Sequence, residues 1–350
     1  MNAAEVNQML PWLLRRENVA LYENSKVIIG DRRKYPFEKV FVECTSVEEV
    51  AKAIEDMVTQ GGGPAVAALY AMAMAARQCQ SKPAERQKKI LQEASLRLIR
   101  TRPTNTSLAR LMEKTSAMLI QFIDKGVPAE LGLLEWIEAY RDENYERYGK
   151  VGEYGASLID DGDGVLTMCF AEISLLISLA LAKKAGKQIH VFTPETRPYL
   201  QGARLTAPSV HEIGIPVQII GDNMPAYILS QGKIQKYFTA ADLVTLDGHV
   251  VNKIGTFQNA ITAHYHGVPY FVFSGGADKK KPDRASIEIE EREPAEMKQC
   301  RGLPTTIPDI DAYYPAFDIT PPHLVSGVVT QYGILNPYDL KTYFGERGLL

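Results

Sequence analysis

A cysteine and an aspartate each follow an apolar segment in the second half of the chain, and both side chains can transfer protons. Cys169 follows residues 165–167, and Asp242 follows YFTAA. Ligands of an open parallel sheet bind at the carboxyl ends of its strands. Taken alone, a cysteine is more often a small buried side chain and an aspartate a helix cap. Together at strand ends, they predict an acid and base pair.

A cysteine nucleophile with a histidine base is the competing chemistry. No histidine follows a predicted strand at a matching position, so acid and base work is preferred to acyl transfer.

The elements that would position this pair alternate between strand and helix. Apolar segments at 165–167, 190–193, 217–220, 237–244 and 270–273 are each followed by a loop or helix, one helix beginning at Asn252. This alternation predicts a doubly wound, Rossmann-like parallel sheet of the α/β class. The predicted carboxyl ends collect Cys169, Glu195, Gln201, Asp222, Asn223, Asp242, Asn252 and Lys253.

The first half of the chain predicts a smaller, mainly helical domain. Residues 1–45 read as a short helix and a β ribbon, and TSVEEV at 45–50 begins a helix that should end at Gln60. Residues 149–164 are glycine-rich and poor in apolar side chains, which indicates a boundary. We therefore expect domains at 1–150 and 151–350.

Two segments of this half could bind an anion. GGGPA at 61–65 leads into a helix, where the amides of Gly62 and Gly63 could contact a phosphate. Arg102, beside Arg100 and just before another helix, could form a charged fork. The alternatives are a tight turn between helices and surface arginines in a polar loop.

Composition excludes several function classes. The 350 residues are 45% hydrophobic and 23% charged with a formal net charge of -3, so no basic field attracts nucleic acid. No leader and no apolar segment of membrane-spanning length is visible, which predicts a cytoplasmic protein without a membrane partner. The four cysteines and the histidines lack metal spacing, so no metal site is expected.

Several segments give the chain a family resemblance. They include ETRPYLQGARLTA (195–207), GDNM (221–224), NKIGT (252–256), IEIEEREP (287–294) and PAFDITPPHLVSGVVTQYGILNP (315–337). In this order they resemble the methylthioribose-1-phosphate isomerase family, which is related to regulatory subunits of translation initiation factor 2B and to ribose-1,5-bisphosphate isomerases. The resemblance runs from about residue 21 to 337.

The resemblance implies roles for particular residues. It makes Cys169 and Asp242 the catalytic pair of an aldose 1-phosphate isomerase in methionine salvage, without a cofactor, acting on a small phosphorylated sugar as a homodimer. The implied substrate-binding residues are Gly62, Gly63, Arg102, Gln201, Asn252 and Lys253. The apolar segment at 173–182 either adds to a dimer interface or is buried on both sides within one chain.

The chain also departs from the family pattern. Gly61 stands where the isomerases usually have a phosphate-binding arginine, and Met168, Phe170 and Leu243 replace a histidine, an asparagine and an arginine. These departures keep two alternatives open. One is an isomerase of another phosphorylated sugar, such as ribose 1,5-bisphosphate, and the other is a non-catalytic regulatory or sugar-phosphate- or nucleotide-binding protein.

Overall fold

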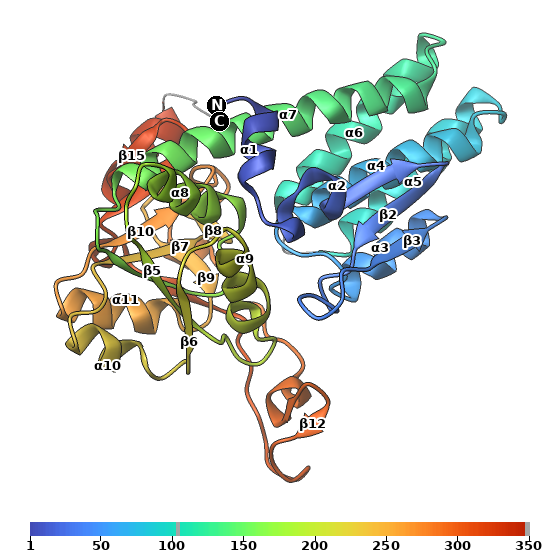
Figure 1. Cartoon of the computed structure of the whole chain (residues 1–350). Helices are drawn as coiled ribbons and strands as arrows, with labels where there is room; N and C mark the ends of the chain where they lie inside the picture. Colours follow the sequence, from blue (N-terminus) through green and yellow to red (C-terminus); the bar gives the residue numbers. More distant parts are fainter. Residues whose placement is uncertain (103–105, 347–350) are drawn as a thin grey trace. The chain divides into compact units, whose positions relative to one another are not determined.

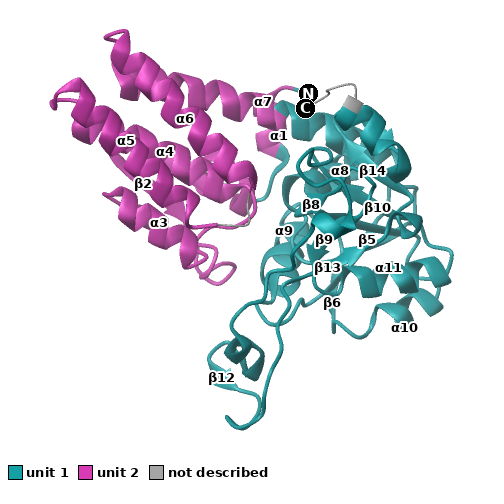
Figure 2. Cartoon of the chain, turned by 180° about the vertical axis from the view of Figure 1, so that it is seen from behind, with its two compact units in different colours: residues 1, 9–11, 146–350 teal, residues 2–8, 12–145 magenta. Residues whose placement is uncertain are grey.

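The computed structural model describes residues 1–102 and 106–346, which form two compact units (Figure 2). The helical unit comprises Asn2–Gln8 and Trp12–Tyr145, and the sheet unit comprises Met1, Met9–Pro11 and Glu146–Leu350. Independent domains at 1–150 and 151–350 stay a prediction. Within the described residues, no helix has the length and apolarity needed to cross a membrane.

The helical unit begins with short helices and an antiparallel sheet of order β1–β2–β3, which confirms the predicted ribbon (Figure 1). Longer helices follow, with α4 packed against α3, α5, α6 and the ribbon. The elements are α1 (Ala3–Met9), η1 (Trp12–Leu14), α2 (Arg16–Val19), β1 (Ala20–Glu23), β2 (Lys26–Gly30), β3 (Phe41–Cys44), α3 (Val47–Glu55), α4 (Gly63–Cys79), α5 (Ala84–Ile99), α6 (Thr106–Asp124) and α7 (Ala129–Ser157).

Helix α3 begins as its sequence predicts but ends earlier. The Ser46 hydroxyl accepts the Glu49 N–H at 3.2 Å, which caps the first turn. The predicted end at Gln60 is wrong, because the helix stops at Glu55. Met57 takes a left-handed φ of 61°, and Val58 donates its N–H to the Ala53 carbonyl at 3.0 Å, closing the helix end.

The glycine-rich segment 149–164 is not a break in structure at its start, because α7 continues to Ser157. A Cβ at Gly152 would lie 2.2 Å from Cγ2 of Ile177, and one at Gly155 would lie 2.1 Å from Oγ of Ser178. These glycines let α7 pack closely on α8, so they indicate helix packing rather than a linker.

The sheet unit carries the larger sheet and its connecting segments. Its elements are β4 (Gly164–Thr167), α8 (Glu172–Lys184), β5 (His190–Pro194), the π-turn η2 (Gly202–Thr206), α9 (Ala207–Glu212), β6 (Val217–Ile220), α10 (Pro225–Ser230), β7 (Lys236–Ala240), β8 (Leu243–Val244), β9 (Val250–Lys253), α11 (Thr256–Tyr265), β10 (Tyr270–Phe273), η3 (Arg284–Ser286), η4 (Pro294–Lys298), β11 (Gln299–Cys300), β12 (Leu303–Pro304), β13 (Phe317–Thr320), η5 (Pro322–Leu324), β14 (Gly327–Thr330), β15 (Gly333–Leu335), η6 (Pro337–Asp339) and η7 (Lys341–Glu346).

Seven of these strands form one sheet, of order β15–β14–β10–β7–β4–β5–β6, parallel except for β15. Both of its faces are covered. The Tyr237 hydroxyl reaches the Thr256 carbonyl of α11, whereas the next residue, Phe238, packs on Phe273, which lies against α7. Successive strand residues point to opposite faces, so the predicted doubly wound α/β fold is confirmed.

The chain reverses its direction across the sheet at β4. It passes from β4 to β5 and β6, and then returns to place β7 on the other side of β4. Ligands of such sheets bind where the strand order reverses, at the carboxyl ends. Cys169 follows β4 and Asp242 follows β7, so these two residues flank the reversal on neighbouring strands.

A second, three-stranded sheet of order β13–β9–β8 lies after β7 in the chain. The prediction that a helix begins at Asn252 is wrong. Asn252 and Lys253 end strand β9, and α11 begins at Thr256. The turn at 245–249 folds β9 back on β8, a local pairing that the alternation of strand and helix does not predict.

Candidate active site

Cys169 occupies a tight turn between β4 and α8, with a left-handed φ of 61°. Both of its backbone polar groups bind threonine hydroxyls. Its N–H donates to Oγ1 of Thr196 at 3.2 Å, and its carbonyl accepts a short hydrogen bond from Oγ1 of Thr206. The turn is therefore held from the loop after β5 and from η2.

A carboxylate after β6 fixes the first of these threonines. Asp222 accepts the N–H groups of Thr196 and Arg197, each at 2.7 Å. Ends of three neighbouring strands are thus linked, from Asp222 through Thr196 to Cys169. Thr196 lies in the motif ETRPYLQGARLTA and Asp222 in GDNM, but their spacing along the sequence does not show that the two residues are in contact.

Cys169 as a residue is half-buried, and desolvation raises the pKa of its thiol to about 11. The charge of Asp242 raises it further, whereas Lys253, the Phe170 N–H and Arg292 lower it. The thiol therefore keeps its proton at neutral pH.

Asp242 lies between β7 and β8, where its N–H donates to the Val251 carbonyl at 2.9 Å. Desolvation raises the pKa of its carboxyl to about 6, against the lowering effects of Lys253 and Arg292. Asp242 is nevertheless an exposed residue, so its proton can exchange with water or with a bound molecule. Near neutral pH the carboxyl can act as an acid or as a base.

Lys253 brings a buried cation to this pair. It is 4% exposed, its Nζ has no hydrogen-bond partner among the described residues, and the nitrogen lies 5.0 Å from the Phe317 ring centre. Desolvation lowers the pKa of Lys253, while Cys169 and Asp242 raise it. A buried ammonium without a hydrogen bond is costly, which indicates that it serves a ligand.

Asn252 and Gln201 are also buried polar residues, each 4% exposed. Asn252 donates through Nδ2 to Oγ1 of Thr256 at 3.0 Å, which leaves its carbonyl end for another donor. Gln201 immediately precedes η2, and its buried Oε1 has no hydrogen-bond partner in the part of the chain described. Both amides can serve hydroxyl groups of a polar ligand.

Arg292 is a member of the site that the sequence reasoning did not name. Its guanidinium lies 5.6 Å from the Phe317 ring centre and donates to Glu290 at 2.7 Å. The backbone N–H of Arg292 donates to the Tyr314 carbonyl at 2.9 Å, which holds Arg292 beside the residues that precede β13. Its charge lowers the pKa of both Cys169 and Asp242. Arg292 lies in the segment IEIEEREP, but it follows no predicted strand or helix, so its position in the sequence did not indicate a site residue.

Three residues at which this chain departs from the family pattern adjoin Cys169 and Asp242 in the sequence. Met168 is 3% exposed and packs so closely on α11 that a Cβ at Gly255 would lie 2.8 Å from its Cε. Phe170 and Leu243 are half-buried. Apolar side chains therefore adjoin both reactive groups.

The predicted anion-binding segments belong to the helical unit. Gly62 caps α4, and the Gly63 amide already donates to the Gln60 carbonyl at 3.0 Å. Arg102 donates to the Ile54 carbonyl at 2.9 Å, so it braces the end of α3. Arg32, which is buried and was not predicted, donates to the Gln60 carbonyl at 2.8 Å. Residues 103–105, which follow Arg102, lie outside the described residues.

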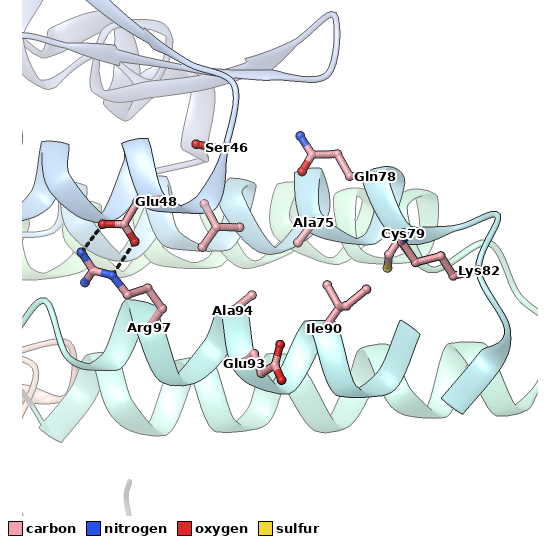
Figure 3. Close-up of a pocket in the computed structure, with 11 residues that line it drawn as sticks. Ser46, Glu48, Ala75, Gln78, Cys79, Lys82, Ile90, Glu93, Ala94 and Arg97 are labelled. Atoms are coloured by element: carbon pink, nitrogen blue, oxygen red, sulfur yellow. Dashed lines mark hydrogen bonds and ion pairs between the residues drawn. The ribbon is translucent and has the colours of Figure 1, made fainter. Parts of the chain in front are cut away.

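A separate hollow of about 460 Å³ lies between α3, α4 and α5 of the helical unit (Figure 3). Arg97 closes one end by pairing with Glu48 across the hollow, and Cys79 and Lys82 line the other. None of the predicted site residues lines it. Arg97 already forms ion pairs with Glu48 and Glu55, so its charge is neutralised.

The fold and the site define a class, an α/β protein with a cysteine and an aspartate at the reversal of a parallel sheet. The model of the initiation factor 2 subunit family matches residues 62–337, and the chain belongs to this family.

Relatives of two named kinds are similar to this chain. The methylthioribose-1-phosphate isomerase of Anaeromyxobacter sp. is 36% identical over 329 residues, covering 90% of this chain and 93% of that protein. The one of Thermosipho africanus is 35% identical, covering 93% and 97%. The crystal structure of 5-methylthioribose 1-phosphate isomerase from Pyrococcus horikoshii matches with a TM-score of 0.84 at 29% identity, covering 94% and 96%. The delta subunit of translation initiation factor eIF-2B from A. fulgidus matches at 0.79 and 32%, covering 92% and 96%.

Proposed function

We propose that this chain is an aldose–ketose isomerase that converts 5-methylthioribose 1-phosphate to the corresponding 2-ketose 1-phosphate. One observation carries the proposal: Cys169 and Asp242 flank the reversal of the sheet, beside the buried ammonium of Lys253. The relatives named methylthioribose-1-phosphate isomerase, at about this chain's full length, support the same activity.

The substrate class sets the first chemical task. The anomeric oxygen of an aldose 1-phosphate is esterified, so the ring cannot open without help. An acid must give a proton to the ring oxygen as its bond to C1 breaks. Asp242 suits this step, because its pKa of about 6 leaves part of the carboxyl protonated at neutral pH. A phosphate dianion nearby would raise that fraction.

The second task moves hydrogen from C2 to C1 and leaves a carbonyl at C2. We assign the C2 proton to the Asp242 carboxylate, which has just given its own proton to the ring oxygen, and its removal leaves an enol between C1 and C2. The Cys169 thiol, which holds its proton at rest, gives that proton to C1 and recovers one from the O2 hydroxyl as the C2 carbonyl forms. Lys253 would stabilise negative charge on the sugar oxygens as it develops. Asn252 and Gln201 would hold the hydroxyl groups. Apolar Met168, Phe170 and Leu243 would exclude water from the reacting carbons.

Phosphate binding is proposed for the helical unit. The start of α4 at Gly62 and Gly63 offers the positive end of a helix, and Arg102 offers a guanidinium. Gly61 removes the arginine that the family resemblance leads one to expect at this loop. Arg32, which binds the carbonyl of Gln60 beside Gly61, keeps a positive charge at the loop.

A direct assay tests the activity. The purified chain is incubated with 5-methylthioribose 1-phosphate, ribose 1,5-bisphosphate and ribose 1-phosphate, and ketose product is followed by NMR. We expect turnover with the first compound and none or little with the others. Product from ribose 1,5-bisphosphate alone would reassign the substrate. No product from any of them would leave a regulatory role like that of the initiation-factor subunits.

A homodimer and a cytoplasmic location are also proposed, the first from the family resemblance alone. Helix α8 no longer supports it, because its residues Leu175–Leu179 are buried within one chain, against α7 and β7. Sedimentation at micromolar concentration should give the mass of two chains, and a single-chain mass would refute the dimer. The location follows from the charged substrate, which crosses hydrocarbon poorly.

A further inference from the structure

The backbone of Cys169 needs support, because a left-handed φ is unfavourable for any residue with a Cβ. Its φ is 61°, yet it lies between a strand and a helix, where no glycine relieves the turn. The N–H and the carbonyl of this one residue are bound by two different hydroxyls, those of Thr196 and Thr206. The turn is thus clamped on both sides.

Each of these threonines is fixed by its own surroundings. Thr196 is fully buried, and Asp222 accepts its N–H at 2.7 Å. Thr206 is 1% exposed and ends the π-turn η2. That π-turn can form because Gly202 has no Cβ, which would otherwise lie 1.8 Å from the Pro194 carbonyl oxygen. Both hydroxyls of the clamp therefore belong to buried threonines on hydrogen-bonded segments.

The turn also orients the thiol. With Cys169 in this conformation, the N–H of the next residue, Phe170, donates to the sulfur. A relaxation of Cys169 out of the left-handed region would change its ψ as well as its φ, and the change in ψ would rotate the N–H of residue 170 relative to the sulfur and remove the contact.

We propose that Thr196 and Thr206 are positioning residues, whose hydroxyls hold Cys169 in the left-handed turn and so aim its thiol at the reacting carbons. Neither touches the substrate. The part that concerns turnover rests on the proposed isomerase function, whereas the part that concerns the thiol does not.

The competing explanation is that the two threonines only fill buried volume. Thr206→Val keeps the shape and removes the hydroxyl, and Thr206→Ser keeps the hydroxyl and removes a methyl group. A packing role predicts that serine is the worse substitute, and a positioning role predicts that valine is. Thr196→Val and Thr196→Ser form a second matched pair in case a Thr206 variant does not fold.

The first measurement follows alkylation of the full chain by iodoacetamide at one neutral pH, with each cysteine located by mass spectrometry. Cys44 and Cys79 are buried, and Cys300, on β11, serves as an internal reference. We expect the Cys169 rate to fall at least about 5-fold in Thr206→Val, as for loss of one hydrogen bond, and to stay within about 2-fold in Thr206→Ser. An unchanged or faster rate in the valine variant, or equal losses in both, would overturn the proposal.

The second measurement is steady-state turnover with 5-methylthioribose 1-phosphate. In Thr206→Val, kcat should fall at least about 10-fold while KM stays within about 2-fold, because the threonine acts through Cys169 and not on the substrate. A loss confined to KM would overturn the positioning role. If the wild-type chain shows no turnover, the isomerase function fails, and the alkylation rates still decide the role of the threonines.

Discussion

Replacement of Asp242 by asparagine tests whether this carboxyl is the acid that opens the sugar ring. At a pKa of about 6, roughly one molecule in ten carries the proton at pH 7. At the ordinary value of 3.8 the protonated fraction would be about 100-fold smaller. The raised pKa therefore increases the supply of the acid form about 100-fold, and an amide cannot supply it at all.

We expect Asp242→Asn to lower kcat at pH 7 by at least about 100-fold, the lower range for a positioned acid. Initial rates with 5-methylthioribose 1-phosphate, followed by NMR, give the measurement. Asp160→Asn is the matched control, because Asp160 is an exposed carboxylate that pairs with Lys236 at the start of β7. A folded Asp242→Asn protein with turnover within about 10-fold of wild type would refute the reasoning.

The same substitution has an expected effect on stability, whose sign follows from the pKa. The folded pKa of Asp242 lies above the unfolded value, so the folded state binds its proton more tightly. This contribution to stability is complete below about pH 4 and is lost as pH rises through about 6. Asp242→Asn should therefore reduce the fall in Tm over this range. A Tm profile steeper than that of wild type would show that the charged carboxylate is stabilising.

The remaining predictions concern the thiol, the phosphate and the packing of α7. Cys169→Ser should lower kcat at least about 100-fold with Tm preserved, and the double variant with Asp242→Asn should be far less impaired than the product of the two single effects. Arg102→Ala should raise KM, because the lost contact to phosphate costs roughly 1.5–3 kcal/mol of binding free energy. Tm should change less, through the lost hydrogen bond to the Ile54 carbonyl. An unchanged KM would show that Arg102 does not bind the phosphate. Gly61→Arg should lower KM if the loop keeps its shape. Gly155→Ala should destabilise the sheet unit by about 1–3 kcal/mol despite better helix propensity, and a raised Tm would contradict the close approach of Ser178.

Much of the fold could be read from the sequence because its signals are local. Alternation of short apolar strands with helices predicted the parallel sheet, and the cap at Ser46 placed the start of α3. Where a tertiary contact decided the outcome, the sequence misled. Gly152 and Gly155 resemble breakers in isolation, but they lie in a helix because α8 approaches them there. Asn252 and Lys253 resemble a helix start, but pairing with β8 and β13 holds them in a strand.

The candidate site shows the same division. The sequence by itself determined that a thiol and a carboxyl follow strands, because residue type and position after an apolar run are local properties. Only the tertiary structure decided that β4 and β7 are neighbours, since strand order depends on which faces pack together and not on order in the chain. It also raised the pKa of Asp242 by partial desolvation, brought Lys253 and Arg292 beside it, and joined Cys169 to Thr196 and Thr206, because those contacts link residues far apart in the sequence.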